Sequence, residues 1–185
     1  MIYLRWLSLA LGDWLLLLTV PFAAPIFAAM YREQPYGMPE YSWGSIWGTY
    51  DNPTQGDEGF VEKRALYPGR TDGWRGYLNR VHWMIRNPLY GYARRAAVEW
   101  KPDFVVTVKG NPDISDKYRI PGWLFARAHN AKGELVAFEL YTVLPWSDSR
   151  DLRMRLGWKI TTDKVHEYGF AQLVNTINPL DGYGS

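Results

Sequence analysis

One apolar stretch near the start of the chain limits what this sequence can fold into. From Trp14 to Tyr31 no residue carries a charge, and at about 1.5 Å per helical residue the stretch would be roughly 27 Å long. That length is close to the roughly 30 Å hydrocarbon core of a bilayer. Leu15 to Leu18 are apolar on every side of a helix rather than along one stripe, which disfavours the surface of a soluble domain. The sequence therefore favours a membrane-type helix over a soluble core helix.

Aromatic residues flank this stretch in the way that membrane interfaces favour. Trp6 and Trp14 lie toward one end and Tyr31 lies at the other. Pro21 and Pro25 each remove a helical hydrogen bond, so they predict a kink or a re-entrant hairpin. We expect lipid contacts from Trp6, Trp14, Leu15, Leu16, Leu17, Leu18, Phe22, Phe27 and Tyr31.

A cleaved secretory signal is the alternative interpretation of the same segment. Arg5 supplies a minimal positive region, and the stretch ends among small residues. Cleavage after Ala24 or Ala29 would place Phe22 or Phe27 two positions before the cut residue, where a small side chain is needed. Export after cleavage therefore ranks second to a retained anchor.

The remaining length is enough for one ordinary domain. The chain has 185 residues, a formal net charge of +2 and no cysteine, which excludes disulfides, thiolate catalysis and cysteine-based zinc sites. Ten tryptophans and 13 tyrosines suit interfaces as well as cores. We expect residues 1–33 to form an apolar anchor and residues 34–185 to form a single α+β domain.

The domain begins with a helix–break–helix pattern. Apolar residues recur at helical spacing from Trp74 to Arg86, and Asn87-Pro88 ends this helix and starts a second short one. The exposed side of the pair should be basic and could lie against an anionic bilayer or only against water. Its basic residues are Arg75, Arg80, Arg86, Arg94 and Arg95.

After Trp100 the apolar pattern changes to the alternation typical of strands. We expect strands over residues 104–109, 123–129, 135–144 and 150–161, with a hairpin around the Asn130–Gly133 turn. These form a small antiparallel sheet of three to four strands. The tail over residues 165–177 is a weaker helix candidate. The fold class is therefore α+β.

The last predicted strand carries the clearest candidate binding site. Arg153, Arg155 and Lys159 alternate with apolar residues, so they share one sheet face, and Arg127 could join them from the hairpin. Such a row could bind phosphates or a partner. The alternative is an ordinary wet sheet face whose charges Glu139 or Glu134 neutralise across the strands.

No residue pattern in the sequence predicts a cofactor, a metal site or a catalytic centre. His82, His129 and His166 are scattered and lack a second ligand at helical spacing. The acidic loop from Asp51 to Glu58 lacks the ligand spacing of a calcium loop. We therefore expect no cofactor and no metal.

Three short motifs give the chain a family resemblance. They are Trp47-Gly48-Thr49-Tyr50-Asp51-Asn52, Trp83-Met84-Ile85-Arg86-Asn87-Pro88 and Arg155-Leu156-Gly157-Trp158-Lys159. With them the chain resembles a family of small uncharacterised proteins of tailed phages. The resemblance implies a phage origin, an apolar N-terminus and a location in the infected host cell, and it carries no activity onto any residue.

The features together lead to three hypotheses of function. The first is a membrane-associated phage protein that acts by binding a host or phage protein, with membrane lipids as a further partner. The second is an enzyme of the bilayer or envelope with a site that only the fold assembles, around His82 or His129. The third, less favoured, is a nucleic-acid binder that uses the basic sheet face. Membrane topology and oligomeric state stay open.

Overall fold

The computed structural model describes residues 1–30, 43–48, 54–162 and 164–181, and its elements form an α+β fold, as predicted. The chain divides into two compact units. Unit 1 contains Met1–Ala10 and Ala96–Ser185, and unit 2 contains Leu11–Arg95. The expected domain boundary between residues 33 and 34 lies outside the described residues.

The apolar N-terminal segment forms two helices where we expected one. Helix α1 covers Ile2–Leu17 and helix α2 covers Val20–Met30. The two are bent by 73° at the break between them. Pro21 explains the break, because in a continuous helix its ring would clash with the carbonyl of Leu17 and it lacks the N–H that would bind that carbonyl. The prolines predicted a kink or a re-entrant hairpin, and the chain does bend here, although it forms two helices and not the one apolar helix of the predicted fold.

Neither helix alone is long and apolar enough to cross a bilayer, and the same holds for every other helix in the described ranges. Only α1 and α2 taken together satisfy that criterion, and they do so by length and composition.

Unit 2 is held together by the packing of α2 on helix α3 (Gly73–Arg86). The buried side of α2 presents Ala23, Ala24, Phe27 and Ala28 to Met84. Small residues let the two helix backbones approach closely, and Trp47 closes the cluster by stacking on Phe27 with 5.3 Å between ring centroids. The short elements of this unit are η1 (Trp43–Ile46), η2 (Phe60–Arg64) and α4 (Tyr90–Arg95).

Arg80 corrects the prediction that all five arginines of the helix pair lie on an exposed side. Arg80 is only 3% exposed. The Nε atom donates to the carbonyl of Ala28 at 3.0 Å, and Nη1 donates to the carbonyl of Thr71 at 3.2 Å. The Ala28 carbonyl belongs to the last turn of α2, where unpaired carbonyls and the helix dipole favour a cation. Arg80 therefore caps α2 instead of facing solvent.

Asn79, next to Arg80 on α3, fastens the segment that precedes this helix. Its Nδ2 donates to the carbonyls of Tyr67 and Arg70 at 2.8 and 2.7 Å, and its Oδ1 accepts from the Tyr67 N–H at 2.9 Å. We expect Asn79→Ala to lower the free energy of unfolding by about 2 kcal/mol, because three backbone groups lose their partner. Urea denaturation followed by circular dichroism measures this.

Asn111→Ala is the matched control, since Asn111 makes similar bonds to Pro121 and Asp113 at an exposed turn. There water can replace the lost partners, so a loss of no more than about 0.5 kcal/mol is expected. Equal losses for the two variants would show that Asn79 does not fasten the segment.

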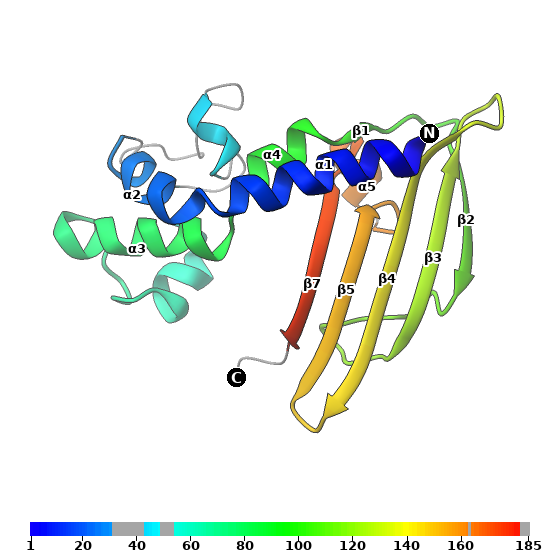
Figure 1. Ribbon diagram of the computed structural model, residues 1–185. Coiled ribbons are helices and arrows are strands. Elements are labelled where there is room, and N and C mark those ends of the chain that lie inside the picture. Colours follow the sequence, from blue (N-terminus) through cyan, green and yellow to red (C-terminus); the bar gives the residue numbers. More distant parts are fainter. Residues whose placement is uncertain (31–42, 49–53, 163, 182–185) are drawn as a thin grey trace. The chain divides into compact units, whose positions relative to one another are not determined.

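Unit 1 is built on one antiparallel sheet of five strands, one more than the largest number predicted. Its order is β2-β3-β4-β5-β7 (Figure 1). The strands are β2 (Val105–Gly110), β3 (Gly122–His129), β4 (Leu135–Ser147), β5 (Arg150–Trp158) and β7 (Leu173–Asp181). The predicted hairpin is confirmed as β3–β4, with Gly133 at φ 78° in its turn. A second sheet pairs β1 (Val98–Glu99) with β6 (Phe170–Ala171).

The fifth strand comes from the tail, which we expected to be helical over residues 165–177. A helix, α5, covers only Lys164–Tyr168, and Gly169 follows it at φ 69°. The chain then runs as β7 alongside β5. Val174, Thr176 and Ile177 are β-branched, and pairing with β5 gives them the pleated surface that such residues favour.

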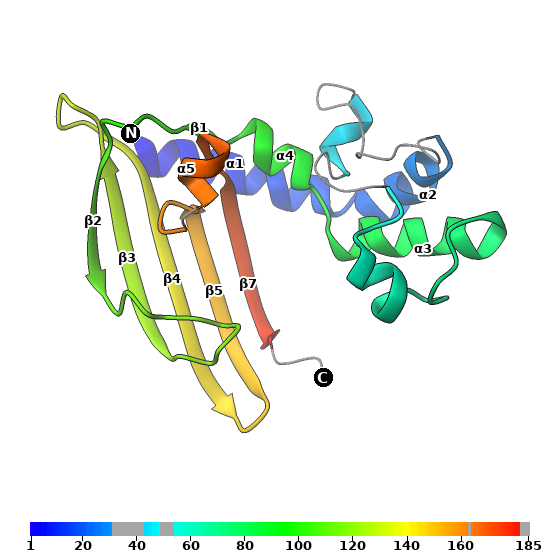
Figure 2. The same cartoon turned by 180° about the vertical axis from the view of Figure 1, so that it is seen from behind.

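The two faces of the sheet are covered by different segments of unit 1. The first turns of α1 lie across one face (Figure 1), where Tyr3 and Trp6 contact Phe138 with ring centroids 4.8 and 5.7 Å apart. Trp158 fills the same face, is fully buried and donates to the carbonyl of Ala96 at 2.9 Å. The loop 111–121 crosses the other face (Figure 2). This second face carries the charged side chains of Arg153, Arg155 and Glu139.

Candidate functional site

The basic side chains of β5 project from the face that the loop 111–121 crosses. Register pairs Arg153 with Val143 and Arg155 with Tyr141, so these four residues share one face of the sheet. Lys159 follows directly after the strand, and the charges of Arg155 and Arg153 act on its ammonium group. Arg153, Arg155 and Lys159, here called the basic row, are therefore brought together as predicted.

Arg127 does not join the basic row. It pairs with Phe138, whose ring packs against α1 on the opposite face, whereas the next residue, Glu139, points toward Arg155. Successive side chains of a strand point to opposite faces, so a residue in register with Phe138 cannot reach the basic row. The sequence identified the strand of Arg127 but not its register.

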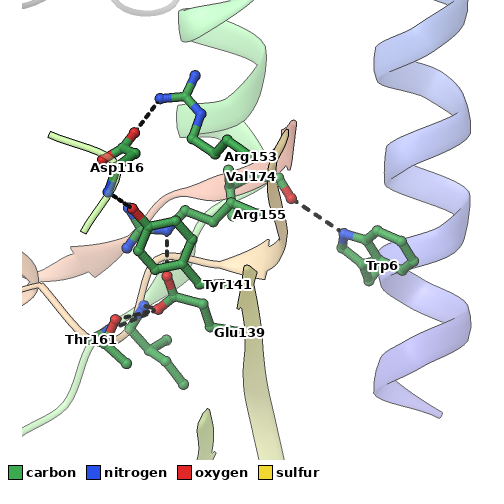
Figure 3. Close-up of polar contacts among 9 residues, drawn as sticks. Trp6, Asp116, Glu139, Tyr141, Arg153, Arg155, Thr161 and Val174 are labelled. Atoms are coloured by element: carbon green, nitrogen blue, oxygen red, sulfur yellow. Dashed lines mark hydrogen bonds and ion pairs between the residues drawn. The ribbon is translucent and has the colours of Figure 1, made fainter. Parts of the chain in front are cut away.

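Glu139 is the central acidic group of the site and is fully buried. Its Oε1 accepts from Arg155 Nε at 2.5 Å, and its Oε2 accepts from the N–H groups of Ile160 and Thr161 at 2.8 and 2.9 Å and from Thr161 Oγ1 at 2.9 Å (Figure 3). A buried carboxylate is tolerated only with such a set of donors. The neutralising role expected for Glu139 or Glu134 thus belongs to Glu139.

Asp116 brings a second carboxylate to the basic row from the loop 111–121. It accepts from Arg153 Nη1 at 2.5 Å, and its own N–H donates to the Tyr141 hydroxyl at 2.7 Å (Figure 3). Burial acts to raise the pKa of Asp116, but hydrogen bonds from Arg153 and Tyr141 and the Arg153 charge outweigh burial and lower it. Burial chiefly raises the pKa of Tyr141 to about 12. The loop is therefore fixed to the sheet by charge and by hydrogen bonds.

A further ion pair fastens the same loop to the end of the β4–β5 hairpin. Arg119 donates from Nη2 to Asp151 Oδ1 at 3.0 Å and from Nε to Asp151 Oδ2 at 3.2 Å, and Asp151 is 1% exposed. Because two parallel bonds fix both groups in one plane, this pair holds the loop at a second point along the strand.

Lys159 differs from the two arginines of the row. Among the described residues no carboxylate forms a salt bridge with it. Burial, and then the charge of Arg155, lowers the pKa of Lys159 to about 8, although Glu139 partly opposes this shift. The row thus has two cations paired with carboxylates and one that is not.

The residues expected to contact lipid fall into three groups. Leu15, Leu18 and Phe22 are 67%, 72% and 77% exposed, and Trp14 and Leu17 are exposed as well. Leu16 is half-buried, and Trp6 lies half-buried against the sheet. Phe27 is 2% exposed in the core of unit 2, so its predicted lipid contact is not compatible with this packing. Tyr31 lies outside the described residues.

Large exposed apolar side chains occur in α1, in the break that follows it and in α2. We call the set Leu11, Trp14, Leu15, Leu18, Phe22, Ile26 and Met30 the apolar ridge. Asp13 is the only charged residue between Arg5 and Arg32, and it lies half-buried. Burial, and then the charge of Asp13, raises the pKa of Tyr92 on α4. The charge of this segment therefore acts on Tyr92 of α4.

The three histidines belong to different local environments. His82 contacts the ring of Phe60 in unit 2, His129 ends β3, and His166 lies edge-on to Trp100. Within the part of the chain that the structure describes, no group of three or more His, Asp or Glu residues could hold a metal ion.

Sequence reasoning missed Asp116, Tyr141 and Thr161. Tyr141 lies two residues after Glu139 on the same strand, so strand alternation was a usable signal for it. Asp116 lies in an irregular loop and Thr161 just after a strand, where periodicity gives no information about direction.

The chain is thus an α+β protein with a five-stranded antiparallel sheet, a buried ion-pair site on one face and an exposed apolar helix pair. It belongs to a family of unknown function (DUF7338), whose model matches residues 1–185. No curated protein matches the chain, and no solved structure matches it either.

Proposed function

We propose that this protein is a membrane-associated binding protein whose apolar ridge inserts into a lipid bilayer. The observation that carries the proposal is the exposure of Leu15 in α1, Leu18 in the break and Phe22 in α2. On the surface of a soluble domain the outward side of a helix is polar, whereas a helix that is apolar all round is buried in protein or in lipid. α2 is of this second type, because its inward side is also apolar.

The lengths of the two helices favour insertion into one leaflet. α1 has 16 residues and α2 has 11, which at 1.5 Å per residue corresponds to about 24 and about 17 Å. Each is shorter than the roughly 30 Å hydrocarbon core. A helix pair bent at Leu18 and Thr19 can instead lie at the interface with its ridge in the acyl region, as amphipathic anchors do. Asp13, half-buried beside α4, would stay out of the lipid.

The basic row gives less support to a nucleic-acid binder. Arg155 is neutralised by Glu139 and Arg153 by Asp116, so of the basic row a polyanion would meet the surplus charge of Lys159 alone, which is too little for a strip of phosphates. Binding of a host or phage protein, and the phage origin itself, stay predictions. The genes that surround its coding sequence would test the phage origin, since phage structural and lysis genes cluster together.

The ridge variant Leu15→Ser/Leu18→Ser/Phe22→Ser tests the proposal by vesicle flotation. We expect the unaltered protein to float with neutral phosphatidylcholine vesicles at high salt, because burial in lipid and not charge holds it there. Each large apolar side chain contributes roughly 1.5–3 kcal/mol when it leaves water, so the variant should bind at least about 100-fold more weakly.

A matched variant on the sheet unit, Val105→Ser/Val108→Ser/Tyr118→Ser, removes three exposed apolar side chains outside the ridge. Its flotation should equal that of the unaltered protein. The proposal fails if both triple variants float alike, or if alkaline carbonate releases the unaltered protein from membranes without detergent.

A further inference from the structure

Among the residues that the structure describes, the polar face of the sheet holds more positive charge than its carboxylates neutralise. Among the described residues, the charged groups that act on Lys159 are Arg153 and Arg155 on β5, Glu139 on β4 and Asp116 in the loop 111–121. Tyr141 lies on the same face of the sheet. At neutral pH the three cations of the basic row face two carboxylates. One positive charge is therefore left over, and it lies at a half-buried position where a counter-ion is worth more than in open water.

Arg155 is held in a geometry that leaves most of its donors available. Its Nε is bound to Glu139, and its guanidinium lies 4.7 Å from the centroid of the Tyr141 ring. In the described parts of the chain only this Nε has a hydrogen-bond partner, and the side chain is 19% exposed. Figure 3 shows the Arg155 side chain between Glu139 and Tyr141. These two residues thus orient the Nη groups, which have no hydrogen-bond partner among the described residues and can take a ligand.

We propose that Lys159 and the Nη groups of Arg155 bind a phosphate-type oxyanion on this face of the sheet. An arginine fork presents parallel N–H groups that match two oxygens of such an anion, and a lysine adds a point charge. The ligand would bring the negative charge that the basic row lacks. A free phosphate ester and a lipid headgroup offer the same chemistry. The inference does not depend on membrane insertion, because the residues that carry it all belong to unit 1.

The proposal makes the binding pH-dependent in a way that an ordinary lysine would not. An anion needs the charged form of Lys159, which is present below the pKa of about 8 and is lost as the pH rises through it. Affinity for sulfate, whose charge is constant in this range, should fall about tenfold between pH 7 and pH 9. A lysine with the ordinary pKa would keep its charge over the same interval.

Titration calorimetry of the full chain in non-ionic detergent, with inorganic phosphate at constant ionic strength, tests the site. Lys159→Met should weaken binding about 10- to 100-fold, as expected for losing a hydrogen bond to a charged group, and Lys159→Arg should retain it. Lys109→Met is the matched control, since Lys109 pairs with Phe125 and so lies on the opposite face. Thermal melting of each variant verifies folding.

A parallel series with vesicles distinguishes the two sources of the anion. A loss on Lys159→Met with inorganic phosphate supports a soluble phosphate ligand. A loss seen only with vesicles that contain phosphatidic acid, and not with phosphatidylcholine alone, supports a headgroup. The proposal is overturned if Lys159→Met binds both probes as the unaltered protein does, or if Lys109→Met weakens binding equally. Flotation of these variants with neutral vesicles should stay unchanged. Failure of the anion-binding proposal would therefore not count against insertion of the apolar ridge into lipid.

Discussion

Replacement of Gly157 by alanine is expected to lower the free energy of unfolding by about 4 kcal/mol, the sum of two effects. Gly157 has φ 108°, a conformation that side chains with a Cβ rarely adopt. A Cβ built there would also lie 2.1 Å from the carbonyl oxygen of Phe138, and neighbouring backbone cannot yield as a flexible side chain would. Because Glu139 and Trp158 adjoin this contact, the polar site and the core are disturbed together.

Gly133→Ala separates the two contributions. Gly133 also has a positive φ, 78°, but a Cβ there would meet nothing within 4 Å. Its substitution should therefore cost only the backbone strain, about 1 kcal/mol. Urea denaturation of both variants measures the difference. Equal losses would mean that β4 does not approach Gly157 as closely as the register indicates.

Glu139→Ala has the second large expected effect, a loss of about 3–5 kcal/mol of unfolding free energy. The substitution leaves Arg155 without its carboxylate and leaves the N–H groups of Ile160 and Thr161 without an acceptor. Burial makes each unpaired group costly, because water cannot replace the lost partner. The effect is again measured by denaturation in urea.

Two companion variants make this prediction specific. Glu134→Ala removes an exposed carboxylate that accepts a hydrogen bond from Asn130 Nδ2, and it should cost less than about 1 kcal/mol. The double variant Glu139→Leu/Arg155→Leu removes both charges, so it should be less destabilising than Glu139→Ala, since no unpaired buried charge is left. A double variant less stable than the single one would argue against a buried ion pair as the dominant contribution.

Local patterns were sufficient to predict the hairpin and the alternation of β5. Both depend on residues near in sequence: Asn130 and Gly133 make the turn, and Arg153 and Arg155 alternate with Leu152 and Met154. β7 could not be found in this way. Its partner in the sheet is β5, and α5 and β6 lie between the two strands along the chain. Only pairing with β5 makes Leu173–Asp181 a strand.

The candidate sites were also predictable to different degrees, because some of their features depend on residues near in sequence and others on residues remote in sequence. Exposure of Leu15, Leu18 and Phe22 follows from a segment with more apolar surface than α3 can cover. The burial of Phe27 depends on contacts with Met84 and Trp47, which are remote in sequence. Asp116 likewise reaches Arg153 only because the loop 111–121 folds back over β4 and β5.

The most direct test of membrane insertion is the depth of a spin label at Leu18. The chain has no cysteine, so Leu18→Cys gives a single labelling site, and Tyr118→Cys gives a control at similar exposure, 69% against 72%. With phosphatidylcholine vesicles, collision with oxygen should dominate at residue 18 and collision with a water-soluble nickel complex at residue 118. Equal access of the nickel complex to both labels, unchanged by vesicles, would contradict insertion of the apolar ridge.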